Sequence, residues 1–321
     1  MTTPRGNRAA LTTLILIVVG LPVLIMGYQY GLRPALADHR IVDIAALAPE
    51  NGGFSPDVVR AEVGETITLR FAADDVTHGI AIGPGLGIDL GHIDPGHVGE
   101  VTVTPEAPGI YTYYCNTWCS TDHWRMRGIL EVVDPNSPGS VAAPSDPIIE
   151  ALSAASIDID SEPLLAEGIF PDRSRGEQSL DGVEIPPNLH DSDWRFTHSP
   201  AEGLVALQTA NPDVPENVLV DVVAYLWSQT TSPDEIKELF AKNCAACHGE
   251  RGAGDGPAAA STLEEPIAYP EAAWLRRGDI WYAKIRRGGM GTDMPNFGTI
   301  FTEEETRLLV DYLRYLSFNE S

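Results

Sequence analysis

An uncharged segment near the start of the chain restricts its fold more than any other feature. No residue from Ala10 to Tyr28 carries a charge. At about 1.5 Å of rise per residue, a helix of this length approaches the roughly 30 Å hydrocarbon core of a bilayer. Pro22 lies inside the segment, and a membrane helix tolerates a proline there. We therefore expect one membrane-spanning helix.

The residues around this segment predict its orientation. Arg5 and Arg8 precede it without a nearby acidic residue, which favours a cytoplasmic N-terminus and an external location for everything after Leu32. The alternative is a signal peptide cleaved near Ala35-Leu36-Ala37, although the apolar run exceeds the usual length of about 7–15 residues. Both interpretations export the rest of the chain. We expect a single-pass plasma-membrane protein with soluble domains on the external or periplasmic side.

Composition excludes some classes of protein. The chain has 21 Lys and Arg against 46 Asp and Glu, a formal net charge of −25. Nucleic acid is therefore not an expected partner, because binding it requires clustered basic residues. The four cysteines are too few for a disulfide scaffold, and they form two close pairs, Cys115/Cys119 and Cys244/Cys247. Such pairs are typical of ligand or cofactor sites.

The hydrophobic pattern changes along the 321 residues, which suggests two or three domains. Alternating apolar and polar runs between Val58 and Val133 predict an antiparallel sandwich or barrel. A Pro/Ser/Gly-rich linker follows at Asp134–Asp146. Helical spacing then predicts an all-α region with helices at Leu219–Trp227 and Glu303–Leu316. The expected parts are 1–37 (cytoplasmic tip, anchor and loop), 38–135 (sandwich), 136–231 (linker and middle segment) and 232–321 (C-terminal domain).

A metal-ligand pattern lies in the sandwich region. Cys115, Cys119, His123 and Met126 form a C-x3-C-x3-H-x2-M loop between two strand-like runs, and His78 lies in an apolar run upstream. Soft sulfur ligands with imidazole select copper or zinc, and a thioether favours copper. A disulfide between the two cysteines or a zinc site of two cysteines and two histidines would be the alternatives, but neither accounts for the methionine.

This pattern resembles the binuclear CuA domain of heme-copper oxidase subunit II and of nitrous oxide reductase, over about residues 55–135. The resemblance implies a cupredoxin-like sandwich holding two copper ions. In that family both thiolates bridge the ions, each ion holds one histidine, and a methionine and one backbone carbonyl complete the shell. The corresponding residues here are Cys115, Cys119, His78, His123, Met126 and the carbonyl of Thr117.

Two positions depart from the subunit II pattern. Ser120 stands where a glycine usually follows the second cysteine, which is a small change. Thr117 stands where many members have a glutamate that also contacts magnesium. The second departure argues against that magnesium site here.

A second motif predicts covalent heme. Cys244-Ala-Ala-Cys247-His248 is the C-x-x-C-H signature, in which two thiols bond the heme vinyl groups and the histidine ligates iron. The chain resembles a class I cytochrome c over about residues 232–317, in the order helix, attachment motif, glycine loop, methionine loop, final helix. The resemblance implies Met294, just before a proline, as the sixth ligand, with Met290 as the alternative.

The remaining features have less specific interpretations. We expect His92, His97, His190 and His198 to be solvated loop residues rather than ligands, and Tyr269, Trp274 and Trp281 to be core or heme-pocket aromatics. Parts of residues 150–230 resemble the C-terminal domain but lack its cysteines and histidine, so this segment is either a heme-less relic or a chance likeness of short helices.

Together the resemblances imply subunit II of a heme-copper terminal oxidase, an electron-transfer subunit with no complete active site. Electrons would pass from an external donor, such as a soluble cytochrome c or a quinol-oxidising complex, through heme c to CuA. The membrane-embedded catalytic subunit I would then reduce oxygen. A single anchor helix resembles the short subunit II of the B family.

Two alternatives stay open. The chain could be the small subunit of a CuA-containing nitric oxide reductase, because substrate choice lies in the partner's binuclear site. It could also be a tethered cytochrome c or copper electron carrier without a permanent catalytic partner. The charge of −25 is compatible with steering of a basic donor and equally with a salty habitat.

Overall fold

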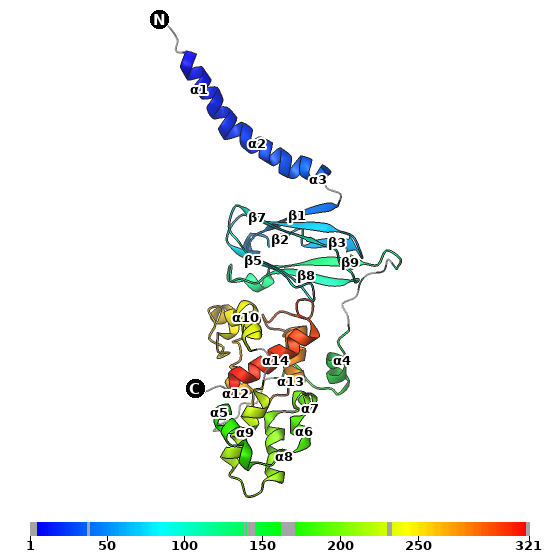
Figure 1. Cartoon of the computed structure of the whole chain (residues 1–321), viewed down its shortest axis with the longest axis vertical. Coiled ribbons are helices and arrows are strands. Elements are labelled where there is room, and N and C mark those ends of the chain that lie inside the picture. Colours follow the sequence, from blue (N-terminus) through cyan, green and yellow to red (C-terminus); the bar gives the residue numbers. More distant parts are fainter. Residues whose placement is uncertain are drawn as a thin grey trace.

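The computed structural model describes residues 5–36, 39–137, 139, 141, 145–161, 171–229 and 233–318. An N-terminal helical segment, a β-sandwich and a helical region follow one another along the long axis of the molecule (Figure 1). The expected boundaries at 37–38 and 231–232 lie outside the described residues. So do Ala37 of the possible cleavage site and residues 138, 140 and 142–144 of the expected linker.

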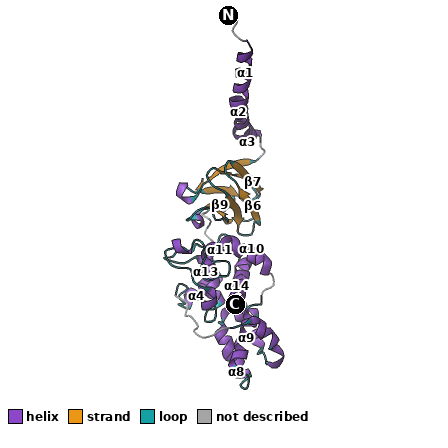
Figure 2. Ribbon diagram, turned by 90° about the vertical axis from the view of Figure 1, so that its left-hand side faces the viewer, coloured by secondary structure: helices purple, strands orange, loops and turns teal. Residues whose placement is uncertain are grey.

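The N-terminal segment is helical throughout its described part. It comprises α1 Arg5–Ile15, α2 Leu21–Met26 and α3 Arg33–Leu36, joined by short π-helical stretches at Leu16–Gly20 and Gly27–Leu32. Residues Ala10–Leu32 have a mean hydropathy of 2.5 over their most apolar stretch, none of which is buried. The segment extends away from the sandwich in both views (Figures 1 and 2). It is compatible with the single membrane span expected from the sequence.

The predicted β-sandwich is confirmed, and it has nine strands in the described residues. One sheet has the order β2-β1-β4-β7 and the other the order β3-β9-β8-β5-β6. The strands are β1 Arg40–Ala46, β2 Phe54–Ser55, β3 Val58–Glu62, β4 Ile67–Ala73, β5 His78–Gly83, β6 Ile88–Ile93, β7 His97–Val103, β8 Gly109–Cys115 and β9 Arg127–Val133. The expectation of a purely antiparallel arrangement is wrong at β1/β4 and β3/β9, which pair in parallel. In each pair the intervening chain visits the opposite sheet before it returns.

The sandwich core lies between the two sheets. Phe54, Phe71 and Tyr113 meet there with ring centroids 5.1–5.9 Å apart. Leu69 and Ile80 are fully buried beside them. Each such side chain contributes about 1.5–3 kcal/mol by leaving water. This packing gives β5 and β8 a rigid position from which to present side chains.

The helical region contains several short helices and two longer ones that meet in its centre. They are α4 Pro147–Ala154, α5 Arg173–Gln178, α6 Pro187–His190, α7 Ser192–Thr197, α8 Pro200–Ala210, α9 Glu216–Trp227, α10 Pro233–Asn243, α11 Ala245–His248, α12 Tyr269–Ala272, α13 Gly278–Arg287 and α14 Glu303–Ser317. The expected helices at Leu219–Trp227 and Glu303–Leu316 are confirmed as α9 and α14. Thr302 and Glu305 cap α14 reciprocally, which satisfies backbone amides at its first turn.

The middle segment and the C-terminal part share one hydrophobic core. Leu219 and Val222 of α9 belong to the same buried cluster as Leu309 and Leu313 of α14. The described residues 171–229 and 233–318 therefore pack as one body. The relic interpretation of the middle segment stays a hypothesis.

The helical region docks on the outer face of the sheet that contains β8. The Oγ1 hydroxyl of Thr112 in β8 donates a 2.8 Å hydrogen bond to Oγ1 of Thr299. The Arg127 guanidinium lies 4.9 Å from the centroid of the Phe297 ring and donates to a backbone carbonyl of the same loop. At Gly83 an added Cβ would lie 2.0 Å from the Ile300 carbonyl oxygen, so glycine is required for this close approach.

Candidate copper and heme sites

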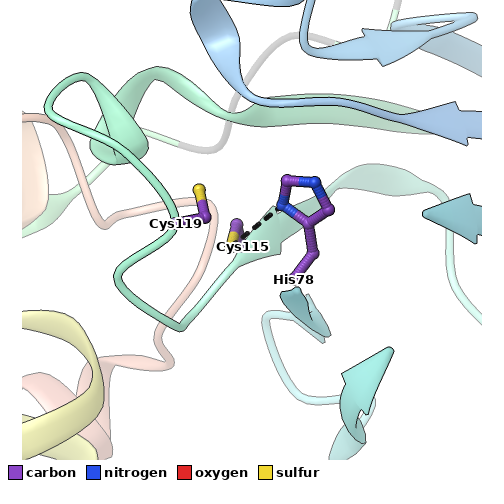
Figure 3. Close-up of side chains that lie close together, drawn as sticks. All are labelled: His78, Cys115 and Cys119. Atoms are coloured by element: carbon purple, nitrogen blue, oxygen red, sulfur yellow. Dashed lines mark hydrogen bonds between the residues drawn. The ribbon is translucent and has the colours of Figure 1, made fainter. Parts of the chain in front are cut away.

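His78 and Cys115 lie side by side on neighbouring strands. β5 and β8 are antiparallel with Ile80 opposite Cys115, so His78, two residues from Ile80, faces the same side as Cys115. His78 is fully buried, and its Nδ1 atom lies 4.0 Å from the Cys115 Sγ atom (Figure 3). The ring and both thiols converge, and the ligand atoms of His78, Cys115 and Cys119 lie within 4.8 Å of one another.

The loop after β8 brings the remaining predicted donors to the same place. The amide of Cys115 donates to the Met126 carbonyl at 3.1 Å, which folds the loop back onto the end of the strand. The Met126 sulfur then lies 4.0 Å from the Cys119 Sγ atom. The Cys115 Sγ atom lies 3.1 Å from the Thr117 carbonyl oxygen. All the predicted sulfur donors and the predicted carbonyl thus gather at one end of the sandwich.

His123 also belongs to this cluster. It begins a short 3₁₀ turn, His123–Arg125, and is buried. Its Nδ1 atom is buried and has no hydrogen-bond partner in the described part of the chain. A buried polar nitrogen without a partner is costly unless it binds a ligand. This orphaned nitrogen, together with soft sulfur donors, fits a copper centre.

The charge distribution favours a thiolate at Cys115. A hydrogen bond from the Cys119 thiol lowers the pKa of Cys115, against the opposing effect of burial and with help from the nearby His123 and His78 imidazoles. The same hydrogen bond and burial raise the pKa of Cys119 above its ordinary value. The two thiols therefore hold one proton between them, and a cation that binds both must displace it.

Asp75 holds the His78 ring, and sequence reasoning missed it. The His78 Nε2 atom lies 2.9 Å from Asp75 Oδ1. Burial raises the pKa of Asp75, but hydrogen bonds from Asn51, His78 and the backbone amides of Ala48 and Val76 outweigh burial and hold this pKa well below its usual range. An ionised Asp75 keeps a proton on Nε2 and leaves Nδ1 free to bind a metal. The only available signal was an aspartate three residues before a histidine.

Gly79 explains how the loop lies so close to β5. An added Cβ at Gly79 would lie 2.2 Å from Asn116 Oδ1 and 2.3 Å from Thr117 Oγ1. A side chain at this position would push the loop, and with it the Thr117 carbonyl, away from the thiols. The absence of a side chain at Gly79 is thus part of the site.

The attachment motif lies where α10 ends and α11 begins. The amides of Cys247 and His248 donate to the Cys244 carbonyl at 3.2 and 2.9 Å, which places the two thiols and the ring on one turn. His248 stacks on Tyr269 with ring centroids 4.8 Å apart, and Tyr269 contacts Trp281 at 5.7 Å. Burial lowers the pKa of His248 to about 4, so the imidazole is neutral at physiological pH, as iron ligation requires.

The two candidate methionines differ in burial. Met294 is partly buried and packs on the same core as Cys244. Met290 is 71% exposed. The charge of Asp293 adds to the effect of burial in raising the pKa of Cys247, which places the Met294 loop beside the attachment motif. This geometry favours Met294 as the sixth ligand.

A buried indole offers a further test of whether heme fits. The Trp281 Nε1 atom is buried and lacks a hydrogen-bond partner in the described residues, and it belongs to the aromatic group around His248. An N–H donor of this kind suits a carboxylate of the cofactor. Two thiols, a neutral imidazole, a thioether and this donor together fit a covalent heme.

The other histidines take no part in either cluster. His92 and His97 are exposed as expected, but they lie in β6 and at the start of β7, so the expectation of loop residues is wrong. His190 is exposed at the end of α6. His198 is partly buried and stacks on Trp194 at 3.9 Å, so it is packed rather than solvated.

Comparison with known proteins tests the second site. The model of the Cytochrome c family matches residues 233–317, so these residues form a cytochrome c domain. This confirms the class of fold expected for the C-terminal part, and it indicates that Cys244, Cys247 and His248 lie in a heme-carrying domain.

Solved structures with limited similarity include a heme-copper terminal oxidase and small copper proteins. A heme-copper terminal oxidase dimer seen by cryo-EM is 20% identical, with 40% of this chain and 100% of that chain covered and a TM-score of 0.26. Auracyanin B is 19% identical over 29% of this chain and 88% of its own, with a TM-score of 0.24. A purple cupredoxin from Nitrosopumilus maritimus is 22% identical over 29% and 99%, with a TM-score of 0.22.

Proposed function

We propose that this chain is the membrane-anchored subunit II of a heme-copper terminal oxidase. It takes electrons from an external donor at a covalent heme c and delivers them through a binuclear CuA centre to a catalytic subunit that reduces oxygen. One observation carries this proposal. A cluster of candidate metal ligands at His78, Cys115 and Cys119 and a cytochrome c domain lie on the two sides of one packed interface, in a chain with an apolar N-terminal helix.

Each bound group would supply a site that gains and loses a single electron at high potential. The chain's own residues hold these groups rigidly. His78, Cys115, Cys119, His123, Met126 and the Thr117 carbonyl would hold the copper ions, and Cys244, Cys247, His248 and Met294 would hold the heme. Neither donor set leaves an open position for a substrate, so the reaction with oxygen belongs to a partner subunit.

The anchor and the charge define the partners in this proposal. The helix at Ala10–Leu32 would pack beside the membrane-embedded subunit I, with its N-terminus in the cytoplasm and both redox domains on the external side. A net charge of −25 would attract a basic donor such as a soluble cytochrome c, and that attraction would weaken as salt is added.

Purification from native membranes tests the proposal directly. We expect two copper ions and one heme per chain, a co-purifying subunit with many membrane helices, and oxygen consumption with a reduced donor. Consumption of nitric oxide without consumption of oxygen would assign the chain to a nitric oxide reductase. A chain that purifies without any catalytic partner would instead be a tethered electron carrier.

Topology is tested separately with intact spheroplasts. External protease should remove the cytochrome c domain, because covalent heme attachment and copper loading belong to that side of the membrane. Protection of the domain until the membrane is lysed would overturn the proposed orientation.

A further inference from the structure

The two faces of strand β8 point toward different sites. Tyr113 and Cys115 face the interior of the sandwich and belong to its core. Thr112 and Tyr114 alternate with them and therefore point outward. Thr112 bonds to Thr299 of the cytochrome c domain, and Tyr114 packs on the hydrophobic core of that domain. One strand thus connects the copper cluster to the helical region.

Tyr114 lies next to the heme attachment motif. It lines a cleft of about 260 Å³ between the two domains, together with Leu239 and Asn243 of α10. Asn243 directly precedes Cys244, and Cys244 packs on the same core as Tyr114. The backbone neighbour of Tyr114 on the other side is Cys115. Cys244 adds to the effect of burial in raising the pKa of Tyr114, so the proposed heme-bonding Cys244 lies near this side chain, and the proposed copper-bridging Cys115 follows it in sequence.

Two contacts between the domains involve residues on either side of Tyr114 in the sheet. On one side Lys242 Nζ lies 2.9 Å from Asp89 Oδ2, and this ion pair ties α10 to β6. On the other side Arg127 stacks on Phe297. The strand register places Tyr114 opposite Arg127 of β9 on one side and opposite Ala81 of β5 on the other, and the β6 partner of Ala81 is Asp89. Tyr114 therefore lies between the two contacts.

We propose that Tyr114 is the positioning residue that couples the heme of the cytochrome c domain to the copper centre. This inference rests on the proposed function. One electron leaves the ferrous heme iron, which becomes ferric, and reduces the oxidised copper pair by one electron. No bond breaks, and Tyr114 keeps its hydroxyl proton, because the ring acts by filling the space between the two cysteines.

The experiment measures electron transfer within the complete, copper- and heme-loaded chain. A light-activated reductant reduces the heme, and absorbance follows its reoxidation and the loss of the oxidised copper band. We expect Tyr114→Phe to keep the wild-type rate, because the ring stays in place. Tyr114→Leu should slow transfer by roughly ten- to a hundredfold, as loss of close positioning does in other intramolecular reactions. Tyr111→Leu is the matched control, because Tyr111 lies on the same strand and packs on the sandwich core instead.

A second measurement does not depend on transfer. The ferric heme speeds the spin relaxation of the nearby oxidised copper pair, and electron paramagnetic resonance reports this effect. If Tyr114→Leu slows transfer and relaxation is weakened, the ring sets the distance between the domains. Slower transfer with unchanged relaxation would overturn the positioning role, because the distance between the two centres would then be the same as in the wild type.

Two further outcomes would overturn it in distinguishable ways. Equal transfer rates in Tyr114→Leu and wild type, with both centres loaded, would exclude Tyr114 and leave the proposed function intact. A wild-type chain that shows no transfer from heme to copper would remove the proposed function and this inference with it. If Tyr114→Leu does not retain copper, the experiment uses Tyr114→Val instead, because a β-branched side chain is well suited to a strand.

Discussion

The Nε2 atom of His78 lies 2.9 Å from Asp75, so the opposite nitrogen of the same ring faces Cys115. Asp75 also accepts hydrogen bonds from the Ala48 amide and the Asn51 side chain, which tie it to the segment after β1. The orientation of a proposed copper ligand is therefore set by a part of the chain that contributes no ligand itself.

Asp75→Asn should weaken copper binding by about 10–100-fold, the usual effect of losing the partner that orients a ligating histidine. The loss arises because Nε2 no longer has an ionised acceptor and the ring can rotate. Competition with a copper chelator measures the affinity. Asp74→Asn is the control, because Asp74 is the exposed neighbour of Asp75. Equal affinities in the two variants would contradict this role for Asp75.

Cys119→Ser should abolish the spectrum of an electron shared between two copper ions, because only one thiolate is left to bridge them. The heme should still be reduced normally, since the core of the helical region is separate from that of the sandwich. Electron paramagnetic resonance of the loaded chain provides the measurement. A spectrum of one copper ion in the unmodified protein would reject the binuclear centre while keeping copper.

Met294→Ala should remove the absorption band of a thioether bound to ferric iron and lower the heme midpoint potential, because water or a stronger base takes the sixth position. Met290→Ala should leave both properties unchanged, as expected for a side chain that is 71% exposed. Redox titration with optical detection distinguishes the two variants. The reverse result would make Met290 the ligand.

Domain docking should weaken in acid through the pair formed by Asp89 and Lys242. Burial raises the pKa of Asp89, but its bond to Lys242 and the Gly91 amide outweigh burial and lower it. A lowered folded-state pKa means that the stabilisation is complete above the ordinary value of about 3.9 and is lost as pH falls through the lowered value. Because both side chains are more than a third exposed, the effect is at most about 1 kcal/mol.

Hydrogen exchange in β6 and α10 measures this docking as a function of pH and salt. Asp89→Asn should exchange faster at neutral pH, and its docking should change less on acidification than that of the wild type. An identical pH response in both proteins would show that other groups control the interface.

The copper loop could be predicted because its chemistry is local. Cys115, Cys119, His123 and Met126 lie within one short stretch of sequence, and no other common site explains a methionine at that spacing. The attachment motif at Cys244 is equally local. For both, the order of residues along the chain carries most of the information.

Features that depend on tertiary pairing were missed. β1 was not predicted, since its seven residues alternate weakly and it becomes a strand by pairing in parallel with β4. The expected loop around His92 is instead part of β6, which forms by pairing with β5. The domain interface is also invisible in the sequence, because the contact between Thr112 and Thr299 joins residues 187 positions apart.

Because the linker at residues 134–146 joins the two domains, their docking requires few contacts. A short linker keeps the cytochrome c domain at an effective concentration in the millimolar range near the copper face. A few polar contacts, such as those of Thr112 and Arg127, are then enough to keep the face covered. A freely diffusing protein present at micromolar levels would compete poorly for that surface. In the proposed function, the tether would thus direct external electron donors to the cytochrome c domain and would fix one heme for each copper centre.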